Sequence, residues 1–366
     1  MEASNGRRKL AFFAVNIIVC CMLFLLIGNC IKTGPYWGEN VDHRLMNPRL
    51  TSTPRSCNER NEQKFVLIFS YERSGSSFLG WAIDQHPAVF YVYEPLNQQS
   101  GPNRSMTFPR NTKIDDKILD LEAEVYKQIQ LCNLDNLPRE CDIMRHTLLH
   151  HARNLIYMEK FSKCIESEKK NPFGIRKLDY CTQGMLGLCK SRQVVLAKEV
   201  RGTMEGLSRY LNTLKCSNNV KVIHLLRDPR GEINSRENAK WTHFAKYRQS
   251  KKYDFISAMC QRMQKDISIR HELEKKYPNM FVQVRYEDFV GDVNTTIGAL
   301  LKFIDLPFFP YHQNTLKLKS ENSSDYVNKW KSTLDRSLQE KIDEQCVGVY
   351  NLLGYQKIIR TEKTYT

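Results

Sequence analysis

A short polar segment around residue 75 has the composition of a phosphate-binding loop. It contains one cation, one glycine and three serines: Arg73, Ser74, Gly75, Ser76 and Ser77. The glycine lets a ligand approach the backbone closely, the hydroxyl groups donate hydrogen bonds, and the guanidinium supplies a fixed positive charge. An NTPase is excluded, because the Walker pattern with its lysine is absent. An ordinary strand-to-helix turn capped by serine hydroxyls is the alternative interpretation.

A second segment, beginning at Arg227, has the same organisation. The apolar run 220–226 ends in the sequence Arg-Asp-Pro-Arg at 227–230, and the helix predicted to follow carries Ser235. Proline is favoured in the first turn of a helix, which supports a strand-to-helix transition here as well. Arg227 and Ser235 are eight residues apart, so both can face one anion across the loop and the first turns. A local ion pair between Arg227 and Asp228 is the alternative.

Charged residues also follow two other apolar runs. Glu94 comes soon after the run 88–92, and a carboxylate there could act as the general base that removes a proton from an attacking hydroxyl group. A surface glutamate in a turn, or a partner for a nearby cation, is the alternative. Lys198 and Arg201 lie at the end of a further run, where either could contact an acidic ligand or pair with the neighbouring Glu199.

These residues need a scaffold that brings strand ends together. Five apolar runs suit strands buried on both faces of a parallel sheet: 65–69, 88–92, 194–197, 220–226 and 281–286. Helical patterns lie between them, at 114–125 and around 142–168. Alternating strands and helices predict an α/β fold with a central, mostly parallel sheet, in which ligands bind at the carboxyl ends of the strands. Both loops and Glu94 would then share one edge of the sheet.

The N-terminal part has the pattern of a membrane anchor and a stem. The run 10–27 contains one strongly polar side chain, Asn16, and basic residues precede it. A cleaved signal peptide is the alternative, but an uncleaved anchor is favoured because the run is longer than the roughly 7–15 residues usual for a signal peptide. We therefore predict a cytoplasmic tail at 1–9, a single transmembrane signal anchor at 10–31, an extended stem at 32–62 and a lumenal domain at 63–366.

The charge balance indicates the kind of partner. The 366 residues include 55 Lys and Arg against 40 Asp and Glu, a formal net charge of +15. Such a balance favours an anionic partner: nucleic acid, a membrane surface, a nucleotide or an acidic glycan. The positive charge is scattered, with no basic repeat, zinc-finger spacing or RNA-binding aromatic motif. A nucleic-acid partner is therefore not expected.

Cysteines and sequons fit a secretory location. Nine of the twelve cysteines lie beyond the predicted anchor, and in an oxidising lumen some should pair. The near neighbours Cys132/Cys141 and Cys181/Cys189 are candidate disulfides, and no cysteine or histidine spacing suggests zinc. N-glycosylation is predicted at three Asn-x-Ser/Thr sequons: Asn103, Asn294 and Asn322.

Four longer motifs extend across the predicted lumenal domain. They are RSGSSF at 73–78, VFYVYEPL at 89–96, LLRDPRGEINSR at 225–236 and VRYED at 284–288, with weaker matches at 322–324, 329–331, 346 and 354–355. Together they resemble the carbohydrate sulfotransferases that use 3′-phosphoadenylyl sulfate (PAPS). Within that family the chain is most similar to the Golgi 6-O-sulfotransferases of galactose, N-acetylglucosamine and N-acetylgalactosamine.

The resemblance implies a P-loop-like three-layer sulfotransferase fold and a role for each matched residue. Residues 73–78, ending at Phe78, would bind the 5′-phosphosulfate of PAPS. Arg227 and Ser235 would bind its 3′-phosphate, and Glu94 would be the catalytic base. Cytosolic relatives place lysine where this chain has Arg73. Because arginine does not readily give up its proton, Arg73 would be catalytic by stabilising charge on the departing phosphate. The scheme requires no metal.

The implied function is transfer of the sulfuryl group of PAPS to a sugar hydroxyl, at C6 of galactose, N-acetylglucosamine or N-acetylgalactosamine in a glycan or proteoglycan. The protein would be a single-pass type II protein of the Golgi membrane with a lumenal catalytic domain. Its partners would be a glycan or glycosaminoglycan acceptor and the membrane. A second copy of the chain, in a homodimer, is a further candidate partner. The motif at 284–288 is expected to be structural, and Trp330 to lie in the core or stack near the nucleotide. The alternative is a non-catalytic glycan-binding membrane protein on the same fold.

Overall fold

The structure is a computed structural model. It describes residues 63–96, 114–137, 184–214, 219–239, 244–311, 313, 316 and 325–357. Several predictions fall outside these residues: the tail, the anchor and the stem, the helical pattern at 142–168, and the sequons at Asn103 and Asn322. Within the described ranges, no helix is long and apolar enough to cross a bilayer. Asn294 is half-buried in the first turn of a helix.

Five parallel strands form the sheet at the centre of the fold. They are β1 (Lys64–Phe69), β2 (Val89–Tyr93), β3 (Val194–Glu199), β4 (Val220–Leu226) and β5 (Phe281–Arg285). Their order is β2-β3-β1-β4-β5, and every neighbouring pair is parallel. All five predicted strands are therefore confirmed, to within two residues at each end. The apolar runs identify them because a parallel sheet covered on both faces needs apolar side chains in both directions.

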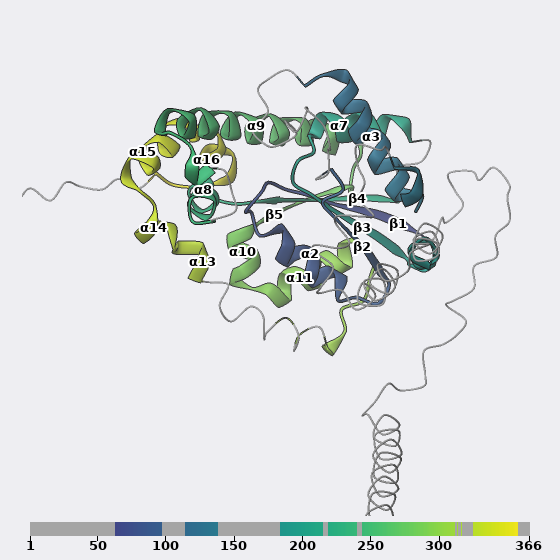
Figure 1. The fold of residues 1–366 in the computed structure, drawn as a ribbon. Coiled ribbons are helices and arrows are strands. Elements are labelled where there is room, and N and C mark those ends of the chain that lie inside the picture. The colour runs from purple at the N-terminus through teal and green to yellow at the C-terminus, as the bar shows by residue number, and fades with distance from the viewer. Residues whose placement is uncertain are drawn as a thin grey trace, which may run out of the picture. The chain divides into compact units, whose positions relative to one another are not determined.

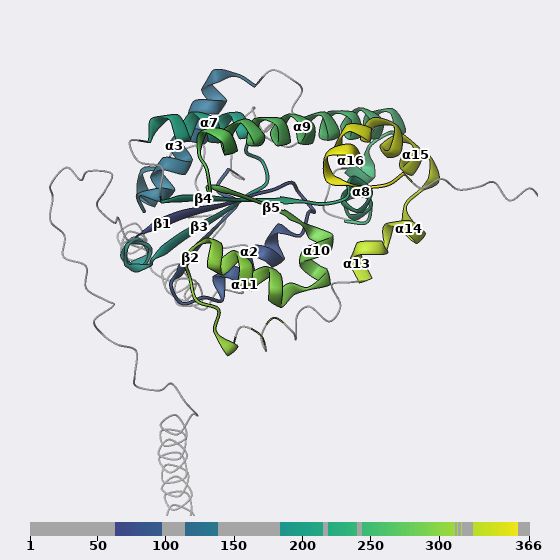
Figure 2. The same cartoon turned by 180° about the vertical axis from the view of Figure 1, so that it is seen from behind.

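Helices cover both faces of the sheet and form the outer two layers (Figure 1). Helices α3, α7 and α9 lie along one face, and α2, α10 and α11 lie along the other, as the reverse view also shows (Figure 2). Their bounds are α2 (Ser76–Asp84), α3 (Asp116–Gln130), α7 (Met204–Thr213), α9 (Gln249–Lys276), α10 (Tyr286–Gly291) and α11 (Val293–Phe303). The predicted three-layer α/β architecture with a parallel sheet is confirmed.

A further group of helices gathers where β4 leads into α8 (Figures 1 and 2). These are α8 (Pro229–Glu237), α13 (Asp325–Asn328), α14 (Trp330–Thr333), α15 (Arg336–Gln345) and α16 (Val347–Leu353). Apart from this group, short 3₁₀ turns occur at Leu134–Asn136 and Phe244–Lys246. Because α8 follows a parallel strand, this group stands at the carboxyl edge of the sheet, where such sheets bind ligands.

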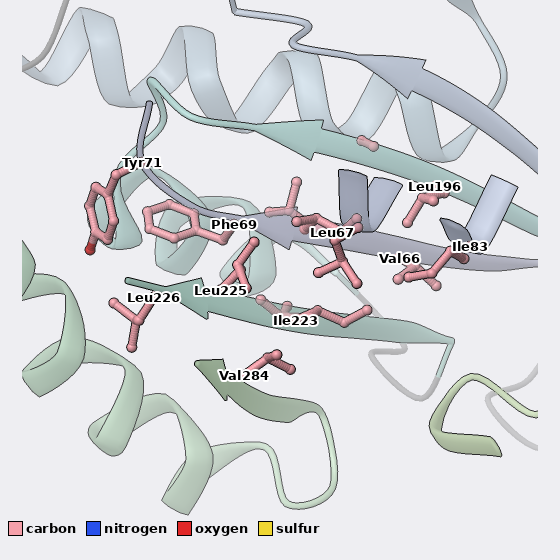
Figure 3. Close-up of a cluster of buried hydrophobic side chains, with 14 of the residues drawn as sticks. Val66, Leu67, Phe69, Tyr71, Ile83, Leu196, Ile223, Leu225, Leu226 and Val284 are labelled. Atoms are coloured by element: carbon pink, nitrogen blue, oxygen red, sulfur yellow. The ribbon is translucent and has the colours of Figure 1, made fainter. Parts of the chain in front are cut away.

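The core is built around β1, which lies between β3 and β4. Residues Phe65 to Phe69 are all almost fully buried. Figure 3 shows side chains from β1, β3, β4, β5 and α2 meeting in this core, among them Leu67, Leu196 and Ile223. The central strand is thus held from both sides, which gives the loop that follows it a rigid base.

Two disulfides lie among the described residues, and they differ from the predicted pairs. Cys132, just beyond α3, bonds to Cys189, with their Cα atoms 5.8 Å apart. Cys260 in α9 bonds to Cys346 between α15 and α16, with Cα atoms 5.1 Å apart. The predicted pairs Cys132/Cys141 and Cys181/Cys189 are therefore wrong. Proximity along the chain suggested them, whereas the fold brings together cysteines 57 residues apart.

Candidate active site

One cavity of about 900 Å³ opens at the carboxyl edge of the sheet, between the ends of β1, β2, β3 and β4. All but one of the predicted binding and catalytic residues line it: Arg73, Gly75, Ser76, Ser77, Phe78, Glu94, Arg227 and Ser235. The exception is Ser74, which is fully buried and whose hydroxyl donates to Glu232 Oε2 at 3.3 Å. Ser74 thus fastens the loop to α8 from behind.

The loop after β1 turns sharply into α2 at Gly75. Gly75 has a left-handed backbone, with φ of 87°, and it is the N-cap residue of α2. A Cβ atom at this position would lie 2.3 Å from the ring of Tyr286, so only glycine fits. No side chain caps this helix N-terminus. Gly75, Ser76 and Ser77 line the cavity, so the positive end of the helix dipole lies at it, as a phosphate site requires.

The loops after β1 and β4 contact each other directly. Arg73 Nε donates to Ser235 Oγ at 3.0 Å, and Arg227 Nη1 donates to the carbonyl oxygen of Arg73 at 2.8 Å. Arg227 Nη2 donates to the carbonyl oxygen of Tyr326 at 2.9 Å. The local Arg227–Asp228 ion pair weighed as an alternative does not form, because Asp228 caps α8 and pairs with Arg230. The two loops form one cationic surface.

Positive charge accumulates at this surface. Burial and the neighbouring guanidinium groups of Arg227 and Arg236 lower the pKa of Arg73. Like charges raise each other's energy when they are held close together. An anion bound between them would relieve this repulsion, so the surface favours a ligand with phosphate or sulfate groups.

Glu94 lies at the other end of the cavity and is almost fully buried. Its carboxylate pairs with Lys198, and its Oε2 atom accepts from Arg201 Nη1 at 2.5 Å. Burial alone would raise the pKa of Glu94, but Lys198 and Arg201 lower it to about 2. The pairing of Lys198 and Arg201 with Glu199 suggested by the sequence does not form. Glu199 instead accepts backbone N–H groups, including that of Arg201 at 2.6 Å.

Backbone strain coincides with two of the predicted catalytic residues. Among the described residues, five non-glycine residues have a positive φ, and they include Arg73 at 74° and Glu94 at 42°. Such conformations cost roughly 1–3 kcal/mol and persist only where the surrounding structure holds them. The hydrogen bonds of Arg227 to the Arg73 carbonyl and of the Glu94 amide to the Lys198 carbonyl, at 2.7 Å, hold both residues in place.

Sequence reasoning missed several residues that line the cavity: Glu72, Tyr93, Tyr326 and Lys329. Tyr326 and Lys329 follow no strand; the weak motif match at 329–331 includes Lys329 but gave it no role. Tyr286 was expected to be structural, yet it lines the cavity, with its ring 4.4 Å from the Arg227 guanidinium. Trp330 is buried, and the Arg230 guanidinium carbon lies 4.3 Å from the centroid of its ring. Trp330 is not among the residues that line this cavity, which agrees with the buried position expected as one of its two alternatives.

Comparison with known proteins identifies the class. A sequence model described as the sulfotransferase family matches residues 66–310. The chain therefore belongs to the sulfotransferase family and is an enzyme of that family. Its relatives include carbohydrate sulfotransferase 5 of Mus musculus, 26% identical over 86% of this chain and 85% of the relative. They also include carbohydrate sulfotransferase 3 of Tetronarce californica, 24% identical over 81% and 73%.

Solved structures give a weaker likeness. A sulfotransferase domain from the curacin biosynthetic pathway is 18% identical with a TM-score of 0.44, covering 81% of this chain and 99% of that chain. A mouse sulfotransferase complexed with PAP is 10% identical with a TM-score of 0.42, covering 81% of this chain and 90% of that chain. The family assignment rests on the sequence match and not on these structures.

Proposed function

We propose that this enzyme transfers the sulfuryl group of PAPS to a sugar hydroxyl of a glycan, at C6 of galactose, N-acetylglucosamine or N-acetylgalactosamine. The observation that carries the proposal is the convergence of Arg73, Arg227 and Ser235 on one side of a cavity that has Glu94 on the other. The carbohydrate sulfotransferases among its relatives support a sugar acceptor. The 6-O position rests on the motif resemblance.

The residues present fit a donor with phosphate groups at both ends. Arg227 Nε is buried and has no hydrogen-bond partner among the described residues. The uncapped N-terminus of α2 and the side chain of Ser77 line the same cavity. Arg73, Ser76, Ser77 and Phe78 would hold the 5′-phosphosulfate, and Arg227 with Ser235 would hold the 3′-phosphate. When bound, the donor supplies the sulfuryl group, whose bond to phosphate oxygen breaks as the acceptor oxygen bonds to sulfur.

The protein's own contribution is positioning, charge stabilisation and proton removal. Arg73 stabilises negative charge developing on the phosphate oxygen and keeps its own proton. Glu94 accepts the proton that the acceptor hydroxyl loses. Its two cationic partners keep the carboxylate ionised, and one of its contacts must loosen for the acceptor hydroxyl to come within hydrogen-bond reach.

The proposed location is the Golgi membrane, with an N-terminal anchor at 10–31 and the catalytic domain in the lumen. The support is the uninterrupted apolar run with basic residues before it. A glycan or glycosaminoglycan would be the macromolecular partner, and the net charge of +15 suits an acidic chain.

The test uses the full-length protein with sulfur-labelled PAPS and a panel of desulfated keratan, chondroitin and N-acetylglucosamine-terminated oligosaccharides. We expect label on the glycan, at C6 when the product is analysed by NMR. The Arg73→Ala variant should abolish the transfer. Binding of 3′-phosphoadenosine 5′-phosphate (PAP) without transfer to any sugar would refute the proposed transfer to glycans and favour a non-catalytic glycan-binding role.

A further inference from the structure

A continuous row of alternating charges runs along the cavity, from the end near Glu94, which is proposed to receive the acceptor, to the end near Arg73, which is proposed to hold the donor. We call it the charge row; its members, in order, are Lys198, Glu94, Arg201, Glu72, Arg236 and Glu232. These side chains come from four separate segments of the chain. Each is largely buried, so solvent screens the ion pairs little.

Arg201 is the junction of the charge row. Its Nη1 atom donates to Glu94 Oε2 at 2.5 Å and its Nη2 atom donates to Glu72 Oε1 at 2.8 Å. A guanidinium group can hold two carboxylates in one plane in this way, whereas an ammonium group cannot. Glu199 accepts the backbone N–H of Arg201, which fixes the loop from which the side chain extends.

Glu72 connects the junction to the donor site. It precedes Arg73, and its Oε2 atom accepts from Arg236 Nη1 at 2.7 Å. Its carbonyl oxygen accepts from Arg236 Nη2 at 2.9 Å. Arg236 in turn follows Ser235. The two ends of this contact are therefore the immediate neighbours of the residues proposed to hold the donor.

We propose that Arg201 and Glu72 are positioning residues that hold the carboxylate of the proposed base Glu94 at a fixed position relative to the loops proposed to bind the donor. The inference rests on the proposed function, because it presupposes that Glu94 removes the acceptor proton. Neither residue need touch the reacting atoms. Arg201 would orient the Glu94 carboxylate and keep it ionised, and Glu72 would transmit the position of the loop after β1 to Arg201.

The environment of Glu94 makes the ionisation role testable. Lys198 and Glu199 of β3 and Arg201 of the loop beyond it interact with Glu94. Glu72, from the loop after β1, contacts Arg201, and the Lys198 ammonium group lies 3.9 Å from the centroid of the Tyr93 ring. Burial favours the protonated carboxyl group, and Lys198 and Arg201 oppose it. Without Arg201, one of the two opposing cations is lost and the pKa of Glu94 should rise.

The experiment compares Arg201→Met with wild type in the full-length protein. We expect kcat to fall about 100-fold, as for a misplaced catalytic group, with PAP affinity changed less than about twofold. The acid limb of the kcat/KM profile should move up by roughly 1–3 pH units, the effect of removing one nearby opposite charge. Carbon-13 NMR of the Glu94 carboxyl group should show the same rise without any transfer assay. Glu72→Gln should lower kcat without moving the acid limb as far.

Arg209→Met is the matched control. Arg209 also bridges two carboxylates, those of Asp116 and Asp120, at 2.6 and 2.7 Å, but it is on the surface away from the cavity. The Arg209→Met variant should leave kcat and the pH profile of kcat/KM unchanged. A lower melting temperature in Arg201→Met with equal loss of activity at every pH would mean a merely structural role and overturn the inference. Wild-type kcat in Arg201→Met would also overturn it. If wild type itself transfers nothing, the proposed function fails and this inference fails with it; if wild type is active and Arg201→Met leaves the carbon-13 titration of Glu94 unchanged, only the inference about Arg201 fails.

Discussion

The two ends of the cavity treat charge in opposite ways. At the proposed donor end, Arg227 makes its hydrogen bonds to backbone carbonyls, and Arg73 has the guanidinium groups of Arg227 and Arg236 near it as well as Glu72. At the acceptor end, Glu94 and Arg201 each have partners of opposite sign. The proposed donor end thus brings guanidinium groups close to one another, while at the proposed acceptor end each charged group lies in an ion pair.

This difference fits what the two ends are proposed to bind. A bisphosphate donor carries several negative charges, and cations that are not neutralised by carboxylates bind it strongly. A sugar hydroxyl is neutral, so an excess of charge at the acceptor end would add a desolvation cost without a compensating attraction. Ion pairs there serve instead to hold one carboxylate in place. Variants at each end should therefore fail in different ways.

The largest effect is expected at Arg73. Removing its guanidinium in Arg73→Ala should lower kcat by roughly 100–1,000-fold, the usual loss when a group that stabilises transition-state charge is deleted. Single-turnover assays with saturating PAPS would measure it. Arg73→Lys should retain part of the activity, because it keeps the charge. Full activity in Arg73→Ala would contradict the proposed role of Arg73 in stabilising charge on the departing phosphate.

Loss of the buried carboxylate in Glu94→Gln should destabilise the fold at neutral pH. The pKa of Glu94, about 2, lies below its ordinary 4.5, so the carboxylate stabilises the fold above pH 4.5 and loses this effect as the pH falls towards 2. The shift corresponds to about 3 kcal/mol. Urea unfolding at pH 7 and pH 3 should show a destabilisation that shrinks in acid. The exposed pair of Glu340 with Arg336 provides the control, Glu340→Gln, which should change little.

At the donor end, Arg227→Ala should weaken binding and leave the pKa of Glu94 alone. A charge-assisted hydrogen bond is worth about 1.5–3 kcal/mol, so PAP should bind about 10–100-fold more weakly. Calorimetric titration with PAP checks this, with Arg209→Ala as the surface control. An unchanged affinity would contradict the assignment of Arg227 to the 3′-phosphate.

The smallest effect is expected from Gly75→Ala, which tests the geometry of the donor loop without changing any charge. The added methyl group meets the Tyr286 ring and a left-handed backbone, so stability should fall by about 1–3 kcal/mol and PAP affinity should fall with it. Gly187→Ala is the control, since a Cβ atom there meets nothing within 4 Å. Equal behaviour of the two variants would show that the loop tolerates a different turn.

Local sequence patterns were sufficient for the sheet and for placing at its carboxyl edge the two loops that are proposed to bind the donor. Buried parallel strands need apolar side chains on both faces, so β1 to β5 appear as apolar runs, and the polar residues that end them mark the ligand edge. The disulfides were not predictable in the same way. Cys132 and Cys189 are separated by 57 residues, and no pattern along the chain records which helix ends lie side by side.

The sequence by itself thus determined where the strands end and which charged residues stand at the sheet edge, because both are set by residue type over a few neighbouring positions. Only the tertiary structure decided the partners of those residues. Arg73 contacts Ser235 across 162 positions, and Arg201 joins Glu94 and Glu72 across 107 and 129. Such pairings depend on the order in which the crossover connections place the strands in the sheet. With another strand order, the same local motifs could have left Glu94 on the surface.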